Sequence, residues 1–199
     1  MGVFAQGTVL FQNRAPGDSI SQVYAPQVED PYTQVTGNTA TDLPAGSAVY
    51  TGAKLAGADW TAQLWAAPGA NASEDSLAAA LPTTTFRTGA AAGWVVMDTI
   101  TLPGVPADAP VATLQMRVFP TSFATWEAAE AAWLADSTGT IWIGKSPTFN
   151  LNNIGGIFNS PPVLTGLQSF SLVANIIPEP STFALLGLGA LGMFLFRRK

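Results

Sequence analysis

The side chains that could do acid–base chemistry in this chain are carboxylates. The sequence contains no histidine and no cysteine, which excludes histidine-activated nucleophiles, thiol nucleophiles, disulfides and zinc sites built on these two residue types. Two adjacent acidic pairs remain, Glu29 with Asp30 and Glu74 with Asp75. Neighbouring side chains point apart in an extended chain, and both pairs lie in segments that we expect to be loops. We therefore predict no catalytic residue, no enzymatic activity and no cofactor.

Calcium is the metal ion that loop carboxylates would suit. Four candidate ligands lie within the first part of the chain: Asp18, Glu29, Asp30 and Asp42. The sequence has no Asp-x-Asp-x-Asp-Gly run, which marks a dedicated calcium loop, and its body has no glycine-rich phosphate-binding loop. We predict no metal site, and whether a loop here binds calcium stays open.

Six tryptophans offer flat rings that could stack on sugars. Trp60 and Trp65 have opposite parity in one expected strand, so at most one of them faces the core. Trp65 shares its face with threonine and glutamine, which makes it the best candidate for an exposed ring, alone or beside Trp142. Packing in the core explains most of the other tryptophans. Trp65 and Trp142 are therefore the predicted sugar-stacking residues, and an extracellular polysaccharide is the partner they would bind.

Short alternating runs between glycine and proline turns predict β-strands along the body. The expected strands cover residues 7–13, 47–51, 59–66, 83–88, 93–102, 111–119, 139–144, 147–151 and 167–173. One helix is expected over residues 125–135, with Thr125 as its N-cap. The pattern favours a mainly β fold, an antiparallel β-sandwich of immunoglobulin-like general architecture, with one inserted helix and a domain over residues 6–174. Residues 15–45 contain few apolar positions and are expected to form a surface loop.

Charge is distributed unevenly along the chain. All 13 acids and five of the eight cations precede residue 180, which gives this part a formal charge of −8. A body of that charge repels phosphate backbones, so we expect no nucleic-acid partner. The remaining three cations, Arg197, Arg198 and Lys199, are the last three residues.

The segment before these cations, residues 183–196, has no charged or polar side chain. As a helix it would be about 21 Å long, short against a hydrocarbon core of about 30 Å. A buried core helix is the alternative, but this helix would be apolar on every face and would end in a basic stop, which favours a transmembrane helix. Membrane lipid would contact its large apolar side chains, and the positive-inside rule places the body outside the cytoplasm. These side chains are Phe183, Leu185, Leu186, Leu188, Leu191, Phe194, Leu195 and Phe196.

Pro178, Glu179 and Pro180 stand directly before the apolar segment. The two prolines keep the tripeptide extended, and Glu179 favours the outer membrane interface. The tripeptide, the short apolar helix and the basic end, in this order, resemble the PEP-CTERM sorting signal, here over residues 175–199 with a linker. The resemblance implies that an exosortase, a membrane-embedded cysteine transpeptidase, reads Pro178, Glu179 and Pro180. It also implies removal of the tail and transfer of the body to the cell surface or to an exopolysaccharide matrix.

The N-terminal residues 1–5 suggest the end of a signal peptide, with short apolar residues before Gln6. A first strand beginning in the same segment explains these residues nearly as well. We expect an exported structural protein of the bacterial surface or matrix, anchored through its C-terminal helix until it is processed. The alternative is a carbohydrate-binding module at the same location.

Overall fold

The computed structural model describes residues 5–175. It is built mainly from β-strands with one α-helix, α1 (Trp126–Ala135). The strands are β1 (Gln6–Phe11), β2 (Arg14–Ala15), β3 (Ser19–Ile20), β4 (Val23–Tyr24), β5 (Trp60–Pro68), β6 (Ala78–Ala79), β7 (Asp98–Pro106), β8 (Val111–Pro120), β9 (Trp142–Lys145), β10 (Phe149–Asn152), β11 (Phe170–Ser171) and β12 (Val173–Ala174). Two short 3-10 helices are η1 (Glu74–Ser76) and η2 (Gly89–Ala91).

The largest sheet has the strand order β12-β9-β8-β5-β6. Its centre is the antiparallel pair β5 and β8, in register from Trp60 opposite Pro120 to Pro68 opposite Ala112. The other edge of β8 pairs with β10 and then with β9. Both central strands are buried on both faces over most of their length, so each face must be covered by another part of the chain.

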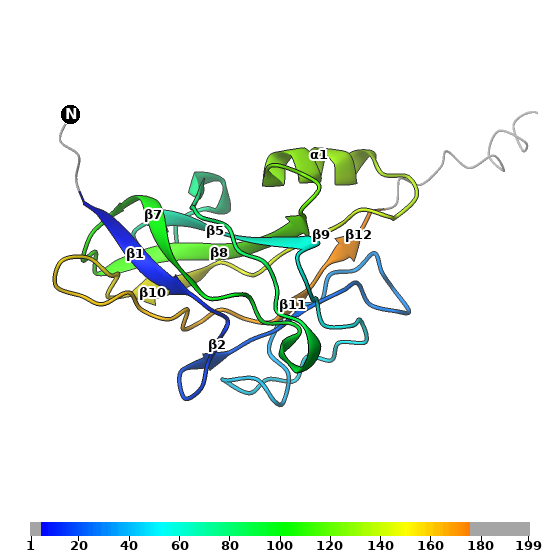
Figure 1. The fold of residues 1–199 in the computed structure, drawn as a ribbon, viewed down its shortest axis with the longest axis horizontal. Helices are drawn as coiled ribbons and strands as arrows, with labels where there is room; N and C mark the ends of the chain where they lie inside the picture. The colour runs from blue at the N-terminus through cyan, green and yellow to red at the C-terminus, as the bar shows by residue number, and fades with distance from the viewer. Residues whose placement is uncertain (1–4, 176–199) are drawn as a thin grey trace, which may run out of the picture.

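A two-stranded antiparallel ribbon, β1 with β7, covers part of one face (Figure 1). Alternation along β1 turns Val9 and Phe11 inward, as expected for a half-buried strand. They join one large apolar core with side chains from β5, β7 and β8. Its fully buried members include Leu64, Ile100, Leu102, Leu114 and Met116.

The opposite face of the sheet lies under α1 (Figure 1). The Thr125 hydroxyl caps this helix by accepting a hydrogen bond from the Ala128 amide, which satisfies one of the free N–H groups of the first turn. Trp126 and Ala129 are the buried side chains of α1 and pack into a second apolar cluster. The predicted helix and its cap are therefore confirmed.

The mainly β class and the two central strands are confirmed, whereas other strand predictions need correction. The strand predicted over residues 167–173 is replaced by two short strands, β11 and β12, which pair with different partners. Residues 47–51 form no strand, residues 83–88 form only isolated bridges, and the strand predicted from residue 93 begins at Asp98. Tyr50 shows why residues 47–51 form no strand, because its hydroxyl donates to the carbonyls of Gly37 and Ser169. These contacts with distant loops replace a strand ladder, and local alternation does not encode them. The immunoglobulin-like arrangement stays a prediction.

The expectation of a surface loop over residues 15–45 is wrong for much of the segment. It contains β2, β3 and β4, and β4 pairs in parallel with β11 near the C-terminal end of the body. Polar side chains inside it are buried because they find partners. Asp42, for example, accepts hydrogen bonds from the Thr39 amide and the Ser169 hydroxyl. Burial, helped by the charge of Asp42, raises the pKa of Tyr24 to about 12.

Within residues 5–175, no helix is both long enough and apolar enough to cross a bilayer. The predicted transmembrane helix, the Pro-Glu-Pro tripeptide, the basic end and most of the predicted signal-peptide remnant lie outside the described residues.

Candidate functional site

The end of the body is fastened to the fold just before the C-terminal segment begins. Strand β12 pairs with β9, with Val173 opposite Ile143 and Ala174 opposite Trp142. The indole N–H of Trp133 on α1 donates to the Val173 carbonyl at 3.0 Å.

Asn175 secures the next residue of this exit. Its amide donates to the carbonyls of Trp133 at 3.0 Å and Leu134 at 3.2 Å, at the C-terminal end of α1. These two carbonyls belong to the last turn of the helix, where the C=O groups lack the usual amide four residues on. The Trp133 carbonyl also accepts from the Asp136 amide at 3.1 Å. The same contacts therefore give the last carbonyls of α1 a donor and attach residue 175 to the helix.

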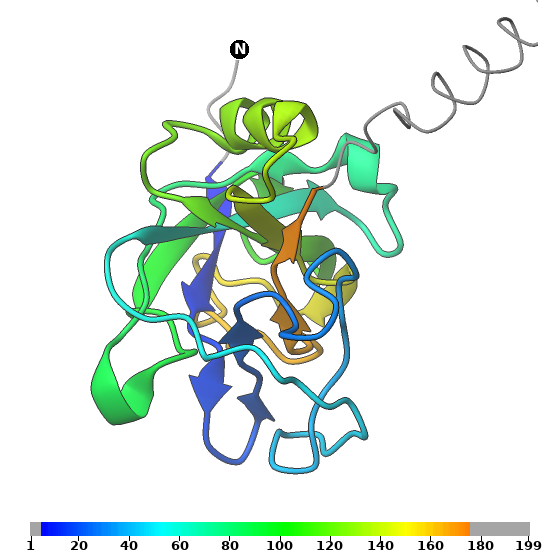
Figure 2. The same cartoon turned by 90° about the vertical axis from the view of Figure 1, so that its right-hand side faces the viewer.

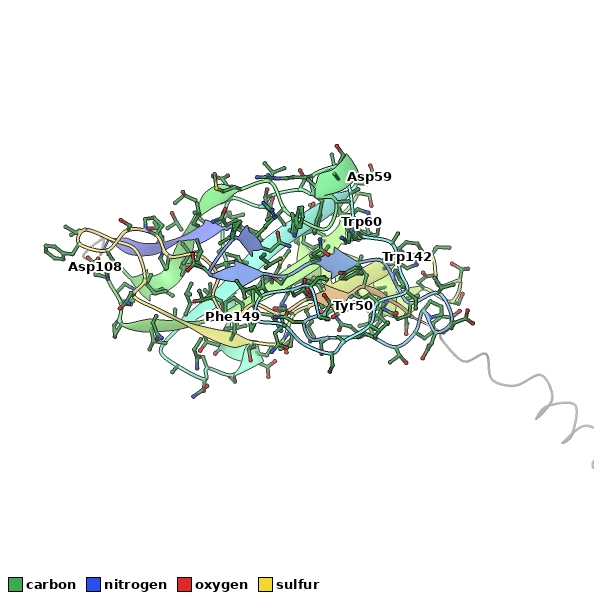
Figure 3. All side chains as sticks on the ribbon, turned by 90° about the horizontal axis from the view of Figure 1, so that it is seen from below. Tyr50, Asp59, Trp60, Asp108, Trp142 and Phe149 are labelled. Carbon is green, nitrogen blue, oxygen red and sulfur yellow. The ribbon has the colours of Figure 1, made fainter. Side chains whose placement is uncertain are left out.

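Trp142 and Trp60 form a stacked pair close to this exit, with ring centroids 6.0 Å apart and planes at 7°. Both labels lie at one end of the molecule in Figure 3, far from Asp108. The Trp142 indole donates to the Gly139 carbonyl at 3.0 Å, and both rings are half-buried. Sugar stacking on Trp142 stays a prediction, restricted by the ring of Trp60 that lies against it.

The expected exposure of Trp65 is wrong, because only 9% of this residue is exposed. The guanidinium carbon of Arg117 lies 3.8 Å from its ring centroid and 5.2 Å from that of Trp126. Helix α1 covers the threonine and glutamine face of β5, so that face is buried as well. Trp65 is a packing residue and offers no ring to a sugar.

Glu74, one of the candidate acids, is held by two cations. Lys145 donates to its carboxylate, and Arg117 lies 3.6 Å from the same oxygen. Partial burial raises the pKa of Glu74, but the hydrogen bond and charge of Lys145, with smaller contributions from Gln115 and Arg117, lower it overall below the ordinary value. A carboxylate with a lowered pKa is ionised at neutral pH and is poorly suited to donate a proton.

This cluster borders an open cleft of about 420 Å³ with a polar lining. Gln34 and Lys145 are among its lining residues, but Gln34 already donates to the carbonyls of Lys145 and Ser171. The Gln34 side chain therefore joins its own segment to the sheet and is not free to bind a ligand in the cleft.

The remaining candidate acids are dispersed. Asp18, Glu29 and Asp30 are exposed, whereas Asp42 is buried and already bonded. Across residues 5–175, no three carboxylates gather in a way that could hold a metal ion.

Residues 177–199 match the family model of the PEP-CTERM protein-sorting motif. The chain carries a PEP-CTERM sorting motif. The match includes Pro178, Glu179 and Pro180 and the basic residues Arg197, Arg198 and Lys199. A PEP-CTERM motif indicates a secreted or surface protein that an exosortase processes. No curated protein and no solved structure matches the chain.

The PEP-CTERM match begins at residue 177, whereas β12 ends at Ala174 and the residue after it, Asn175, is bonded to the end of α1. Sequence reasoning identified the motif but missed the fastening by Trp133 and Asn175. Two turns of helix separate Trp126 from Trp133, a spacing that places both on one face. That spacing was a usable signal for a second contact of α1 with the body.

Proposed function

We propose that this protein is a non-catalytic structural component of the bacterial cell surface or extracellular matrix. An exosortase would release its body from a transient membrane anchor. The PEP-CTERM motif at residues 177–199 is the observation that carries this proposal. In it, residues 183–196 cross the membrane, Arg197, Arg198 and Lys199 stay on the cytoplasmic side, and the body is an immunoglobulin-like β-sandwich outside.

The fastening of β12 supports this function. An enzyme that cuts near the motif needs an extended segment that it can reach. The body before that segment must stay folded while the enzyme binds it. Hydrogen bonds of Trp133 and Asn175 attach the chain to α1 as far as residue 175. The Pro-Glu-Pro tripeptide begins three residues later. The arrangement separates a packed body from a processing segment by a very short connection.

Replacing Pro178, Glu179 and Pro180 together by alanine in a host that encodes an exosortase tests the proposal. The matched control is Ser181→Ala in the adjacent position. Wild type and control should give a shortened species at the surface, whereas the triple variant should stay full-length in the membrane fraction with at least tenfold less at the surface. Processing of the triple variant at the wild-type rate would contradict an exosortase-read motif.

The matrix role needs a second readout from the same cells. Extracellular polysaccharide is separated from the medium, and the body is quantified in each fraction. Enrichment with the polysaccharide is expected for a matrix component, and recovery only as free protein in the medium would contradict that role.

A carbohydrate-binding module is the alternative function. Of the two predicted sugar-stacking residues, only Trp142 keeps a half-buried ring. Loss of polysaccharide binding in Trp142→Ala, with binding kept in Trp133→Phe, would favour this alternative.

A further inference from the structure

Three of the five cations in the body surround a single tryptophan. The guanidinium carbon of Arg14 lies 4.7 Å from the ring centroid of Trp94, and the Lys54 ammonium lies 6.0 Å from it. Arg87 lines a pocket together with Arg14 and Trp94. In a body with an excess of acids, this is a local concentration of positive charge.

These cations have no carboxylate partner in the part of the chain that the structure describes. The ion pairs within 4.0 Å among residues 5–175 join only Arg117 and Lys145 to Glu74. Like charges gathered around one ring repel each other unless an anion lies among them. Cations that have no carboxylate partner among the described residues, in a body with an excess of acids, are therefore available to a ligand anion.

The backbone around Trp94 is held rigidly by Asn13. The buried Asn13 amide donates to the carbonyls of Ser21 and Gly93, and its oxygen accepts from the Val95 amide, each at 2.9 Å. Two of these three bonds tie the residue before Arg14 to Gly93 and Val95, the residues that flank Trp94, and the third ties it to Ser21.

Backbone contacts position the other two cations. The Arg87 amide donates to the Trp94 carbonyl at 2.9 Å. Gly93 has a φ of +86°, and a Cβ there would lie 3.4 Å from the Cβ of Lys54. The positive φ favours glycine at this position, and the Gly93 amide donates to the carbonyl of Leu55, the residue after Lys54, at 2.6 Å. Backbone bonds therefore bring the chain at Arg87 and at Lys54 beside Trp94.

The pocket between these residues measures about 210 Å³ and is lined by Gln12, Arg14, Arg87, Trp94 and Val95. The indole nitrogen of Trp94 is buried and has no hydrogen-bond partner. Guanidinium, ammonium and indole groups can only donate hydrogen bonds. The complementary ligand is therefore rich in acceptors and negatively charged.

We propose that this pocket binds an oxyanion group: a carboxylate, sulfate or phosphate. Arg14 and Arg87 donate charge-assisted hydrogen bonds to it, which are strong and well suited to the planar fork of arginine. Lys54 does not line the pocket, but its ammonium lies 6.0 Å from the Trp94 ring centroid and adds a third positive charge nearby. The site lies around β2 and η2, away from β12 where the described chain ends (Figure 2), and it does not depend on the function proposed for the sorting motif.

Calorimetric titration of the full-length chain in detergent tests the site. The probes are inorganic sulfate, inorganic phosphate, acetate and glucuronate, with glucose as the neutral control, all at constant ionic strength. We expect the wild type to bind at least one oxyanion and not glucose. Arg87→Gln should weaken that binding at least fivefold.

Lys145→Gln is the matched control, because it removes one charge from a half-exposed cation that lies in the Glu74 cluster instead of the pocket. Binding in this variant should stay within twofold of the wild type. Circular dichroism checks that both variants are folded. Trp94→Phe, which removes the indole N–H together with its five-membered ring, is an independent second variant and should also weaken oxyanion binding.

The probes also separate two sources of the oxyanion. Tighter binding of sulfate or phosphate than of glucuronate assigns a free inorganic anion, whereas tighter binding of glucuronate than of sulfate, phosphate and acetate assigns an acidic saccharide. The absence of binding by every oxyanion would overturn the proposal, and so would equal weakening by Arg87→Gln and Lys145→Gln.

Discussion

Arg117 and Lys145 share one carboxylate but lie in very different surroundings. The Arg117 side chain is 9% exposed and lies against the rings of Trp65 and Trp126, whereas the Lys145 side chain is 41% exposed. Burial lowers the pKa of Arg117, although nearby acids, Glu74 first among them, oppose this effect. Arg117 and Lys145 carry the same formal charge, but we expect the buried Arg117 to contribute more to the free energy of unfolding than the exposed Lys145.

Removing the two cations one at a time should reveal this difference. Arg117→Ala should lower the free energy of unfolding by about 2–4 kcal/mol, because the packing between two indole rings is lost with the charge. Lys145→Ala should cost about 0–1 kcal/mol, as is usual for an exposed ion pair. Urea unfolding of both variants measures the difference, and equal losses would show that Arg117 is not a packing residue.

Glu74 predicts a pH dependence of stability. Its pKa in the fold is lowered from 4.5, so its contribution is complete above about pH 4.5 and is lost as the pH falls through the lowered value. Glu74→Gln should therefore be less stable than the wild type at pH 7, by about 1 kcal/mol or less because the side chain is 38% exposed. The difference should shrink towards pH 3 in thermal unfolding, and a difference that grows on acidification would contradict the assignment.

Helix α1 shows what sequence patterns can and cannot predict about an element. Its existence, bounds and cap follow from Thr125 and the alanine-rich run, because capping and helix propensity are local. The same reasoning placed Trp65 on a solvent face, since alternation tells which side chains share a face and not which face another element covers. The burial of Trp65 depends on α1 packing back across β5 and β8, a contact between distant parts of the chain.

The N-cap of α1 gives a prediction for this element. Thr125→Ala should lower the free energy of unfolding by about 0.5–2 kcal/mol, because the Ala128 amide loses its acceptor. Thr125→Ser keeps the hydroxyl and serves as the control, with an expected loss of only a few tenths of a kcal/mol. Chemical denaturation compares the two, and similar losses would show that the hydroxyl bond does not stabilise the helix.

At the scale of the whole molecule, the sequence predicted the C-terminal sorting motif better than it predicted how distant parts of the body pack together. The sorting motif was predicted because its three parts are contiguous in sequence, and it is confirmed over residues 177–199. The layer formed by residues 15–45 was missed because polar residues such as Asn38 and Asp42 are buried through bonds to Ser169, far away in sequence. The Trp94 pocket was missed for the same reason, since Arg14, Lys54 and Arg87 meet only in the fold.

The coupling between body and sorting motif is the last feature that can be tested. Trp133→Phe keeps an aromatic ring in place but removes the donor to the Val173 carbonyl. A lost hydrogen bond of about 1 kcal/mol should lower the hydrogen-exchange protection of residues 173–175 roughly fivefold while the central strands stay protected. Trp142→Phe removes a comparable donor, to Gly139, and should leave β12 protected. If both variants lowered the hydrogen-exchange protection of residues 173–175 equally, general packing at the sheet edge would hold β12. The specific hydrogen bond from Trp133 would then not be what separates the body from the sorting motif.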